Sequence, residues 1–129
     1  MIINKKHMEF YKLDLNKDSS WVTPEGYPEG IKQKILSGEL DEKNKTGSRT
    51  RLLHIEPGTF TIEPFMHDYW EEVFLFDGDL RVGSDKYGKL GDEFRRWTYA
   101  VRPPGAWHGP FATTNGCTVL EIHYYDGEN

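Results

Sequence analysis

The chain has 129 residues, of which 36% are apolar and 14% aromatic, and its formal net charge at pH 7 is −5. This length suits one domain that buries its own core, and the aromatic content excludes a disordered chain. The acidic balance argues against a nucleic-acid partner, because phosphate binding needs a basic face. Cys117 is the single cysteine, which excludes an intrachain disulfide and a thiolate metal cage.

Neither a membrane span nor a secretion signal is predicted. No run approaches the roughly eighteen apolar residues of a transmembrane helix. The alternating, charged N-terminus has neither the apolar core nor the cleavage site of a secretory signal. We therefore expect a single cytoplasmic domain over residues 1–129, with no membrane partner.

The first third of the sequence gives weak secondary-structure signals. Residues 8–15 alternate loosely and suggest an edge strand, whereas residues 19–30 are rich in turn formers and predict a loop. Residues 31–40 alternate apolar and basic side chains and suit either a strand or a short helix. The charged run 41–49 predicts a solvated turn or loop. N-terminal strands and loops are thus expected over about 8–49.

Strand signals strengthen from residue 50. Short segments rich in β-branched and aromatic residues are bounded there by Gly, Pro or Asp. They are TRLLHIEP, TFTIEPF, EEVFLFDG, WTYAVRP and CTVLEIHYY, at residues 50–57, 59–65, 71–78, 97–103 and 117–125. A polar insertion, 83–95, separates two of them, and no stretch keeps a helical period over three turns. The prediction is an all-β fold, a small barrel or sandwich.

His67 stands in PFMHDYWEEVFLFDG, four residues before Glu71. On one straight strand the two side chains would lie roughly 13 Å apart, too far to share an ion. If residues 68–70 form a hairpin turn, His67 ends one strand and Glu71 begins the next, so their side chains converge. Only one of Glu71 and Glu72 then faces the interior, because neighbours on a strand point to opposite faces.

His108 follows a rigid turn in RPPGAWHGPF. Pro103 and Pro104 fix φ, and Gly105 permits a sharp reversal. Such a turn holds the next side chain in a defined place, as a ligand requires.

At these residues the sequence resembles the cupin superfamily, whose fold is a double-stranded β-helix, a jelly-roll-like barrel. Pro103, Gly105 and His108 match the second cupin motif, Pro-x-Gly-x-x-His, in full. The resemblance covers about residues 50–125 as the barrel core. The sequence is most similar to short, single-domain, RmlC-like cupins, which include the zinc-binding cupin domain of an anti-sigma factor and many uncharacterised bacterial proteins.

The first cupin motif has two histidines one residue apart, then a glutamate, then a glycine. His67 takes the second histidine position, Glu71 the glutamate position and Gly78 the glycine position. The first histidine is replaced by Phe65, and the spacing from Gly58 to His67 is about two residues longer than in the usual motif. The motif therefore supplies only three of the usual four ligands, and a fourth would have to come from elsewhere in the chain.

The resemblance implies that His67, Glu71 and His108 bind a divalent metal, which would be Fe, Zn, Mn or Ni. Two imidazoles and one carboxylate are a known minimum for Fe(II) with open positions, and catalytic zinc is also held by three protein ligands. Candidates for a further ligand or a substrate contact are His54, His123, Tyr69 and Glu63. His123 shares a strand face with Glu121 and Tyr125. Candidate pocket residues are Phe65, Trp70, Tyr99, Trp107 and Phe111.

The leading hypothesis is a metal-dependent enzyme that acts on a small organic molecule by dioxygenase-like or Lewis-acid chemistry, without assignable catalytic residues. One alternative is a non-catalytic ligand-binding or sensor cupin. Another is a metal-free, isomerase-type cupin, which the substitution at Phe65 leaves open. Cupins commonly dimerise through N-terminal strands, so we expect a homodimer formed by residues 8–15 and 31–37.

Overall fold

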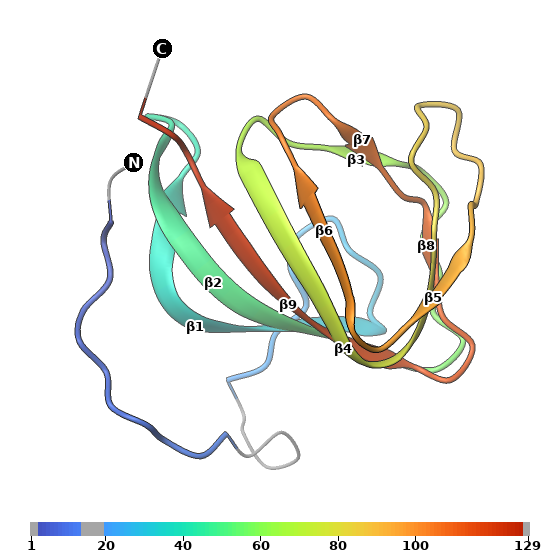
Figure 1. Cartoon of the computed structure of the whole chain (residues 1–129), viewed down its shortest axis with the longest axis horizontal. Coiled ribbons are helices and arrows are strands. Elements are labelled where there is room, and N and C mark those ends of the chain that lie inside the picture. The colour runs from blue at the N-terminus through green and yellow to red at the C-terminus, as the bar shows by residue number, and fades with distance from the viewer. Residues whose placement is uncertain (1–2, 14–19, 128–129) are drawn as a thin grey trace.

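The protein was analysed as a computed structural model that describes residues 3–13 and 20–127 (Figure 1). Within these ranges the chain forms β-strands and no helix. The strands are β1 (Ile31–Asp41), β2 (Thr46–Ile55), β3 (Phe65–Met66), β4 (Trp70–Val82), β5 (Glu93–Arg95), β6 (Thr98–Arg102), β7 (Trp107–His108), β8 (Phe111–Ala112) and β9 (Cys117–Tyr124). The predicted all-β class is confirmed. A helix able to cross a membrane is not found in these ranges.

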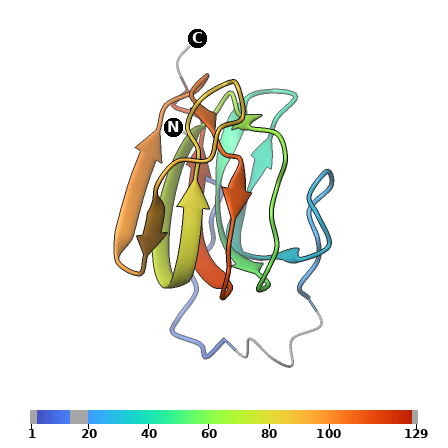
Figure 2. The same cartoon turned by 90° about the vertical axis from the view of Figure 1, so that its right-hand side faces the viewer.

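The strands curve around a common interior. One antiparallel sheet has the order β1-β2-β9-β4-β6, and the second half of β4 continues away from it to pair with β5 and β8. A separate two-stranded sheet, β3-β7, lies on the same side as β8 and β5 (Figure 1). Figure 2 looks onto that side of the molecule. This arrangement places the large sheet opposite the small ones, with the interior between them.

Strand β4 serves both sides of the barrel because it bends. Its register with β9 shifts between Leu75 and Asp77, and Gly78 has φ +90°. A Cβ at Gly78 would lie 2.0 Å from the carbonyl oxygen of Gly116, so only glycine fits the bend. The glycine position of the first motif is therefore needed to turn the strand.

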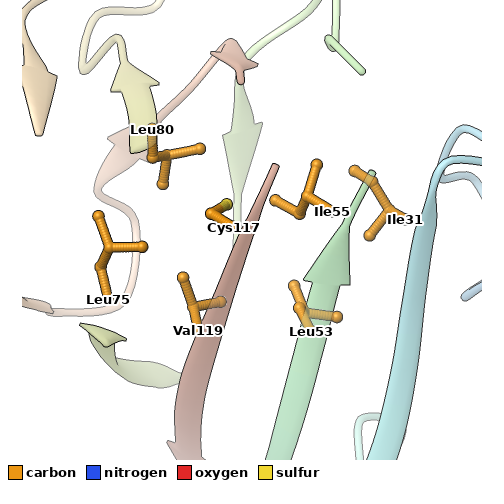
Figure 3. Packing of buried hydrophobic residues seen from close by; sticks show 7 residues of the cluster. All are labelled: Ile31, Leu53, Ile55, Leu75, Leu80, Cys117 and Val119. Atoms are coloured by element: carbon orange, nitrogen blue, oxygen red, sulfur yellow. The ribbon is translucent and has the colours of Figure 1, made fainter. Parts of the chain in front are cut away.

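The core lies between the large sheet and the opposite wall. Alternate residues of β2 and β9 point inward, as a strand with one buried face requires. The buried cluster consists of Ile31, Leu53, Ile55, Leu75, Leu80, Cys117 and Val119. Figure 3 shows these side chains pointing toward one another from strands far apart in the sequence. The cluster forms the apolar wall on which the functional site is built.

The N-terminal predictions are confirmed in part. Of the two alternatives for residues 31–40, the strand is confirmed, because β1 pairs with β2 along its length. The predicted loop 41–49 is shorter than expected, since β2 already begins at Thr46. No strand is present at 8–13, where the chain has no sheet partner; the rest of that prediction, 14–15, lies outside the described residues. The predicted loop is present from 20 to 30, apart from a single bridge of Val22 to β1, and residue 19 lies outside the described residues.

Two predictions in the second half are also wrong in part. Residues 59–64 are not a strand, because only Phe60 makes an isolated bridge, to Ala112 of β8. The polar insertion 83–95 is not wholly irregular, since its last residues form β5 against Asp79–Arg81 of β4.

Candidate metal centre

The segment between β3 and β4 brings His67 close to Glu71, but not through the predicted hairpin. Strand β3 pairs with β7 and not with β4, so residues 67–69 form a corner between two sheets. The Nε2 atom of His67 nevertheless lies 3.9 Å from Oε2 of Glu71. The predicted hairpin is therefore wrong, although the side chains of His67 and Glu71 do converge.

The proline turn positions His108 against the same corner. Gly105 has φ +84°, and its N–H donates a hydrogen bond of 2.8 Å to the carbonyl oxygen of His67. In the β3-β7 ladder Phe65 lies directly opposite His108. The rings of His67 and His108 are 4.8 Å apart between centroids, and Nε2 of His108 lies 3.7 Å from Oε1 of Glu71. Residues about forty positions apart therefore meet at one point.

His67, Glu71 and His108 form a set of donors that suits a divalent metal. One ligand atom from each lies within 4.8 Å of the other two. Burial lowers the pKa of His67 to about 4 and also lowers the pKa of His108, so both imidazoles are neutral at pH 7. The Nδ1 atom of His108 lies 3.4 Å from the carbonyl oxygen of Ala106, which favours a lone pair at Nε2. Two neutral imidazoles and a carboxylate fit Fe(II) or Zn²⁺.

A row of charged side chains crosses the large sheet beside these donors. The strand register places Arg102 of β6, Glu71 of β4, His123 of β9 and Arg49 of β2 next to one another. Arg102 donates a hydrogen bond of 3.0 Å from Nη1 to Oε1 of Glu71. On the other side, Nε2 of His123 lies 3.1 Å from Oε2 of Glu71. Glu71 is 3% exposed, so these partners compensate its burial.

Arg49 determines the role of His123. The Nε and Nη2 atoms of Arg49 lie 3.2 and 2.8 Å from Nδ1 of His123. A guanidinium can only donate, so Nδ1 accepts and the ring proton is on Nε2. Nε2 then donates to Glu71. It also lies 3.3 Å from Oε1 of Glu121. Glu71, Glu121 and His123 are also close enough to hold an ion, but the lone pair of His123, at Nδ1, accepts from Arg49 and the nitrogen facing the two carboxylates carries the proton.

The next row contains a buried ion pair. Arg51 and Glu121 are opposite each other on β2 and β9, with 2.7 Å between Nη2 and Oε1. Arg51 is 3% exposed and also donates to Gln33 and Tyr27. Burial alone would raise the pKa of Glu121, but Arg51 and His123 outweigh burial and hold it well below its ordinary value. This ion pair lies next to the row that contains Glu71 and His123.

Among the four candidates for a further contact, His123 and Tyr69 lie in the site. The buried Tyr69 ring stacks on His67 with centroids 4.6 Å apart. His54 points outward and its Nδ1 lies 3.0 Å from Oγ1 of Thr118, because its neighbours on β2 take the inward face. Glu63 is exposed in the loop before β3, outside the site. The expectation for His54 and Glu63 is therefore wrong.

A cavity of about 340 Å³ extends from Glu71 and His108 into the core. Its walls include every aliphatic member of the buried cluster in Figure 3. Glu71, Arg102, His108 and Glu121 lie at its polar end. A mostly apolar space with a few polar groups at one end is typical of a small-molecule site.

The predicted pocket aromatics divide into two groups. Phe65 and Phe111 line the cavity, and Phe65 stacks on His108 with centroids 6.1 Å apart. Tyr99 also borders this cavity, but it is 56% exposed and its hydroxyl donates a hydrogen bond to Glu72 on the outer face. Trp70 and Trp107 do not line it. The Trp70 ring stacks instead on Tyr124 on the outer face of the large sheet, and Trp107 is 39% exposed. Both alternate with inward neighbours, Glu71 and His108, and so point away from the interior.

The sequence interpretation missed the three arginines Arg49, Arg51 and Arg102. A signal for two of them was present: in SRTRLLHI they alternate in phase with Leu53, which lies in the core. An arginine on the inward face of a strand needs a buried acid. The acid is Glu121, in phase with Val119 on β9.

No protein-family model matches the chain, and no curated protein sequence matches it at a significant level. Solved structures do. An RmlC-like cupin from Shewanella frigidimarina NCIMB 400 has 12% identity and a TM-score of 0.66, over 96% of each chain. The polyketide cyclase RemF from Streptomyces resistomycificus has 14% identity and a TM-score of 0.65, over 94% of this chain and 88% of that one. An acetylacetone dioxygenase from Acinetobacter johnsonii has 20% identity and a TM-score of 0.62, over 94% and 78%.

At these identities the likeness concerns the fold. The chain has the double-stranded β-helix fold of the RmlC-like cupins, which confirms the predicted fold class. The narrower resemblance to the cupin domain of an anti-sigma factor stays a prediction.

The buried imidazoles make the stability of the metal-free protein depend on pH. In the unfolded chain His67 takes up a proton near its ordinary pKa of about 6.5, but in the folded protein only near pH 4. The free energy of unfolding therefore falls as pH drops from 6.5 towards 4, by on the order of 1–3 kcal/mol. Urea unfolding in chelator between pH 4.5 and 7.5 measures this, with His67→Gln as the comparison. We expect the free energy of unfolding of the wild type to fall more steeply on acidification than that of His67→Gln. An equal dependence on pH in the two proteins would contradict this expectation.

Proposed function

We propose that this chain is a metal-binding protein in which His67, Glu71 and His108 hold one divalent ion and the adjoining cavity receives a small organic molecule. The observation that supports this most strongly is the meeting of two neutral imidazoles and a carboxylate, of which His108 and Glu71 also line the polar end of an apolar cavity. The whole of residues 1–129 would act as one domain. The metal would be Fe, Zn, Mn or Ni.

When bound, such an ion would supply Lewis-acid or redox chemistry to a ligand placed beside it. The chain's own residues have separate tasks. Arg49 fixes the His123 tautomer, and His123 orients Glu71 through Oε2. Tyr69 holds the His67 ring in place by stacking, and the apolar walls keep water away from the centre.

We further propose that the protein is an enzyme, with dioxygenase-like chemistry as the first activity to test. The Acinetobacter johnsonii structure is that of an acetylacetone dioxygenase, and its likeness to this chain motivates the choice. A metal-free, isomerase-type cupin is the second candidate. It is favoured by the fact that Arg102 and His123 already satisfy both oxygens of Glu71. A non-catalytic ligand-binding protein is the third.

Elemental analysis of protein purified without chelator distinguishes a metal-dependent enzyme from a metal-free, isomerase-type cupin. We expect close to one equivalent of a first-row metal. Oxygen consumption by Fe(II)-loaded protein with small diketones and carboxylic acids then distinguishes a dioxygenase-like enzyme from a non-catalytic ligand-binding protein. Protein without metal, which also gains no stability from Fe²⁺, Zn²⁺, Mn²⁺ or Ni²⁺, would contradict the proposal.

Restoring the missing histidine should strengthen metal binding. Phe65 lies opposite His108, and its ring centroid is 6.4 Å from that of His67, so Phe65→His places a third imidazole beside the centre. We expect the affinity for Zn²⁺ to rise about tenfold, which corresponds to ~1.4 kcal/mol. Competition with a chromophoric chelator measures it, and Phe65→Leu is the control that removes the ring without adding a donor. Equal affinities for the two variants would count against the assigned centre.

We also propose a homodimer and a cytoplasmic location. Strand β1 is at the edge of the large sheet, and among the described residues its backbone over 31–37 pairs, on the side away from β2, only through the isolated bridge from Val22. An edge of this kind can pair with the same edge of a second copy. Light scattering at micromolar concentration should give a mass near twice 15.0 kDa. A monomer would contradict the proposal.

A further inference from the structure

The polar end of the cavity carries more positive than negative charge. Two buried carboxylates, those of Glu71 and Glu121, face three guanidiniums, those of Arg49, Arg51 and Arg102. The two rows together are therefore +1 without a metal and +3 with a divalent ion. Protonation of any of the three histidines would add to this excess. Glu42, which acts on Arg49, and Asp92, which lines the cavity, are exposed and screened by water.

The three arginines differ in what they could offer to a ligand. Arg51 lies against Glu121, Gln33 and Tyr27, and these partners occupy its guanidinium. Arg49 lies behind His123 and does not line the cavity. Arg102 does line it, and among the described residues its guanidinium has Glu71 as its hydrogen-bonding partner, through Nη1. Arg102 is thus the cation from which an incoming anion can accept hydrogen bonds.

A metal ion would weaken the hydrogen bond that Arg102 donates to Glu71. Glu71 is both the proposed metal ligand and the partner of Arg102, at 3.0 Å. A carboxylate bound to a dication presents less negative charge to a neighbouring guanidinium. The Arg102 side chain is 17% exposed, so its charge then needs another partner. A guanidinium forms paired hydrogen bonds with a carboxylate more readily than with a neutral group.

The rest of the cavity limits the shape of that partner. Its walls are aliphatic and aromatic, which disfavours sugars and other molecules with many hydroxyl groups. Its volume of about 340 Å³ is at the small end of the ~300–1,000 Å³ typical of ligand pockets. No second arginine or lysine lines it among the described residues, which disfavours a dianion.

We propose that the cavity binds a small apolar monocarboxylate, with the carboxylate on Arg102 and the apolar part among Leu53, Leu75 and Val119. This inference rests on the proposed metal centre, because the ion supplies most of the excess positive charge and weakens the attraction of Glu71 for Arg102. It names the chemical class of ligand for that centre.

Calorimetric titration of the full chain loaded with one equivalent of Zn²⁺ tests the inference. The probes are hexanoate and phenylacetate. The amide of each acid is its neutral control, and hexylamine is the cationic control. We expect at least one acid to bind about tenfold or more tightly than its amide, and hexylamine not to bind. In Arg102→Met that preference should fall below about twofold while zinc is retained. Arg95→Met is the matched control, since Arg95 has a largely exposed side chain and does not line the cavity.

Zinc content measured on the same samples separates the two proposals. If the wild-type protein retains no zinc, the metal centre and the inference built on it both fail. If zinc is retained but neither acid binds more tightly than its amide, including the case in which nothing binds, the inference alone is overturned. The inference also fails if Arg102→Met keeps the preference, because the acid would then bind to the ion without the arginine.

Discussion

We expect replacement of both His67 and His108 by alanine to weaken metal binding by more than roughly 100-fold. Loss of a single hydrogen-bond partner of a ligand already costs about 10–100-fold, and here two of three ligands are removed. Metal content after purification without chelator, followed by competition with a chromophoric chelator, measures the loss. His108 lines the cavity and His67 lines a separate surface pocket, so shortening either side chain leaves the strand pairing intact.

His54→Ala is the matched control for this experiment. His54 also lies on a strand, but it points outward and its hydrogen-bond partner is Thr118. The control should bind metal like the wild type. Equal metal content in the wild type and the double variant would remove the proposed centre.

The second large effect concerns stability. Breaking the buried pair of Arg51 and Glu121 from one side, with Arg51→Met or Glu121→Gln, should lower the free energy of unfolding by about 3–5 kcal/mol. The loss is large because the remaining group stays buried without its partner, and small domains have only about 5–15 kcal/mol of stability in total. Urea unfolding in chelator measures it without a contribution from bound metal.

A double-mutant cycle tests the cause. The cycle uses Arg51→Met and Glu121→Leu, each alone and both together. The combined change removes both charges, so the double variant should be more stable than either of these single variants. Lys45→Met is the control, because it breaks an exposed ion pair with Asp68 and should cost less than about 1 kcal/mol. Strictly additive losses at Arg51 and Glu121 would mean that the pair is not coupled.

The fold class and the metal-ligand candidates could be predicted from short-range patterns. The Pro103 to His108 motif is local, and its turn depends on residues that fix φ, so its geometry could be expected before any long-range contact was known. Alternation along residues 71–75 correctly indicated that Glu71 and Glu72 point to opposite faces. Glu71 is buried, and Glu72 instead accepts a hydrogen bond from Tyr99.

The partners of those residues depended on strand order, which a single sequence does not contain. His67 approaches Glu71 because β3 pairs with β7, and no pattern near residue 67 specifies that partner. The row from Arg102 to Arg49 exists because β6, β4, β9 and β2 are neighbours in one register. A one-residue slip in any pair would move a charged side chain to the other face.

The aromatic residues show the same division. Phe65 and Trp70 both lie near the first motif, and the sequence could not distinguish their roles. Phe65 faces the cavity, whereas Trp70 pairs with Tyr124 on the outside, because β4 begins at that position. Where a strand begins determines which face each residue takes, and strand ends are poorly marked by composition.

A crystal of the protein soaked in Zn²⁺, with diffraction recorded at the zinc absorption edge, tests the central claim most directly. The account predicts one strong anomalous peak per chain, about 2.0–2.2 Å from Nε2 of His67, Nε2 of His108 and one oxygen of Glu71. An ion bound between Glu121 and His123 instead, or no ion within reach of the two imidazoles, would contradict it.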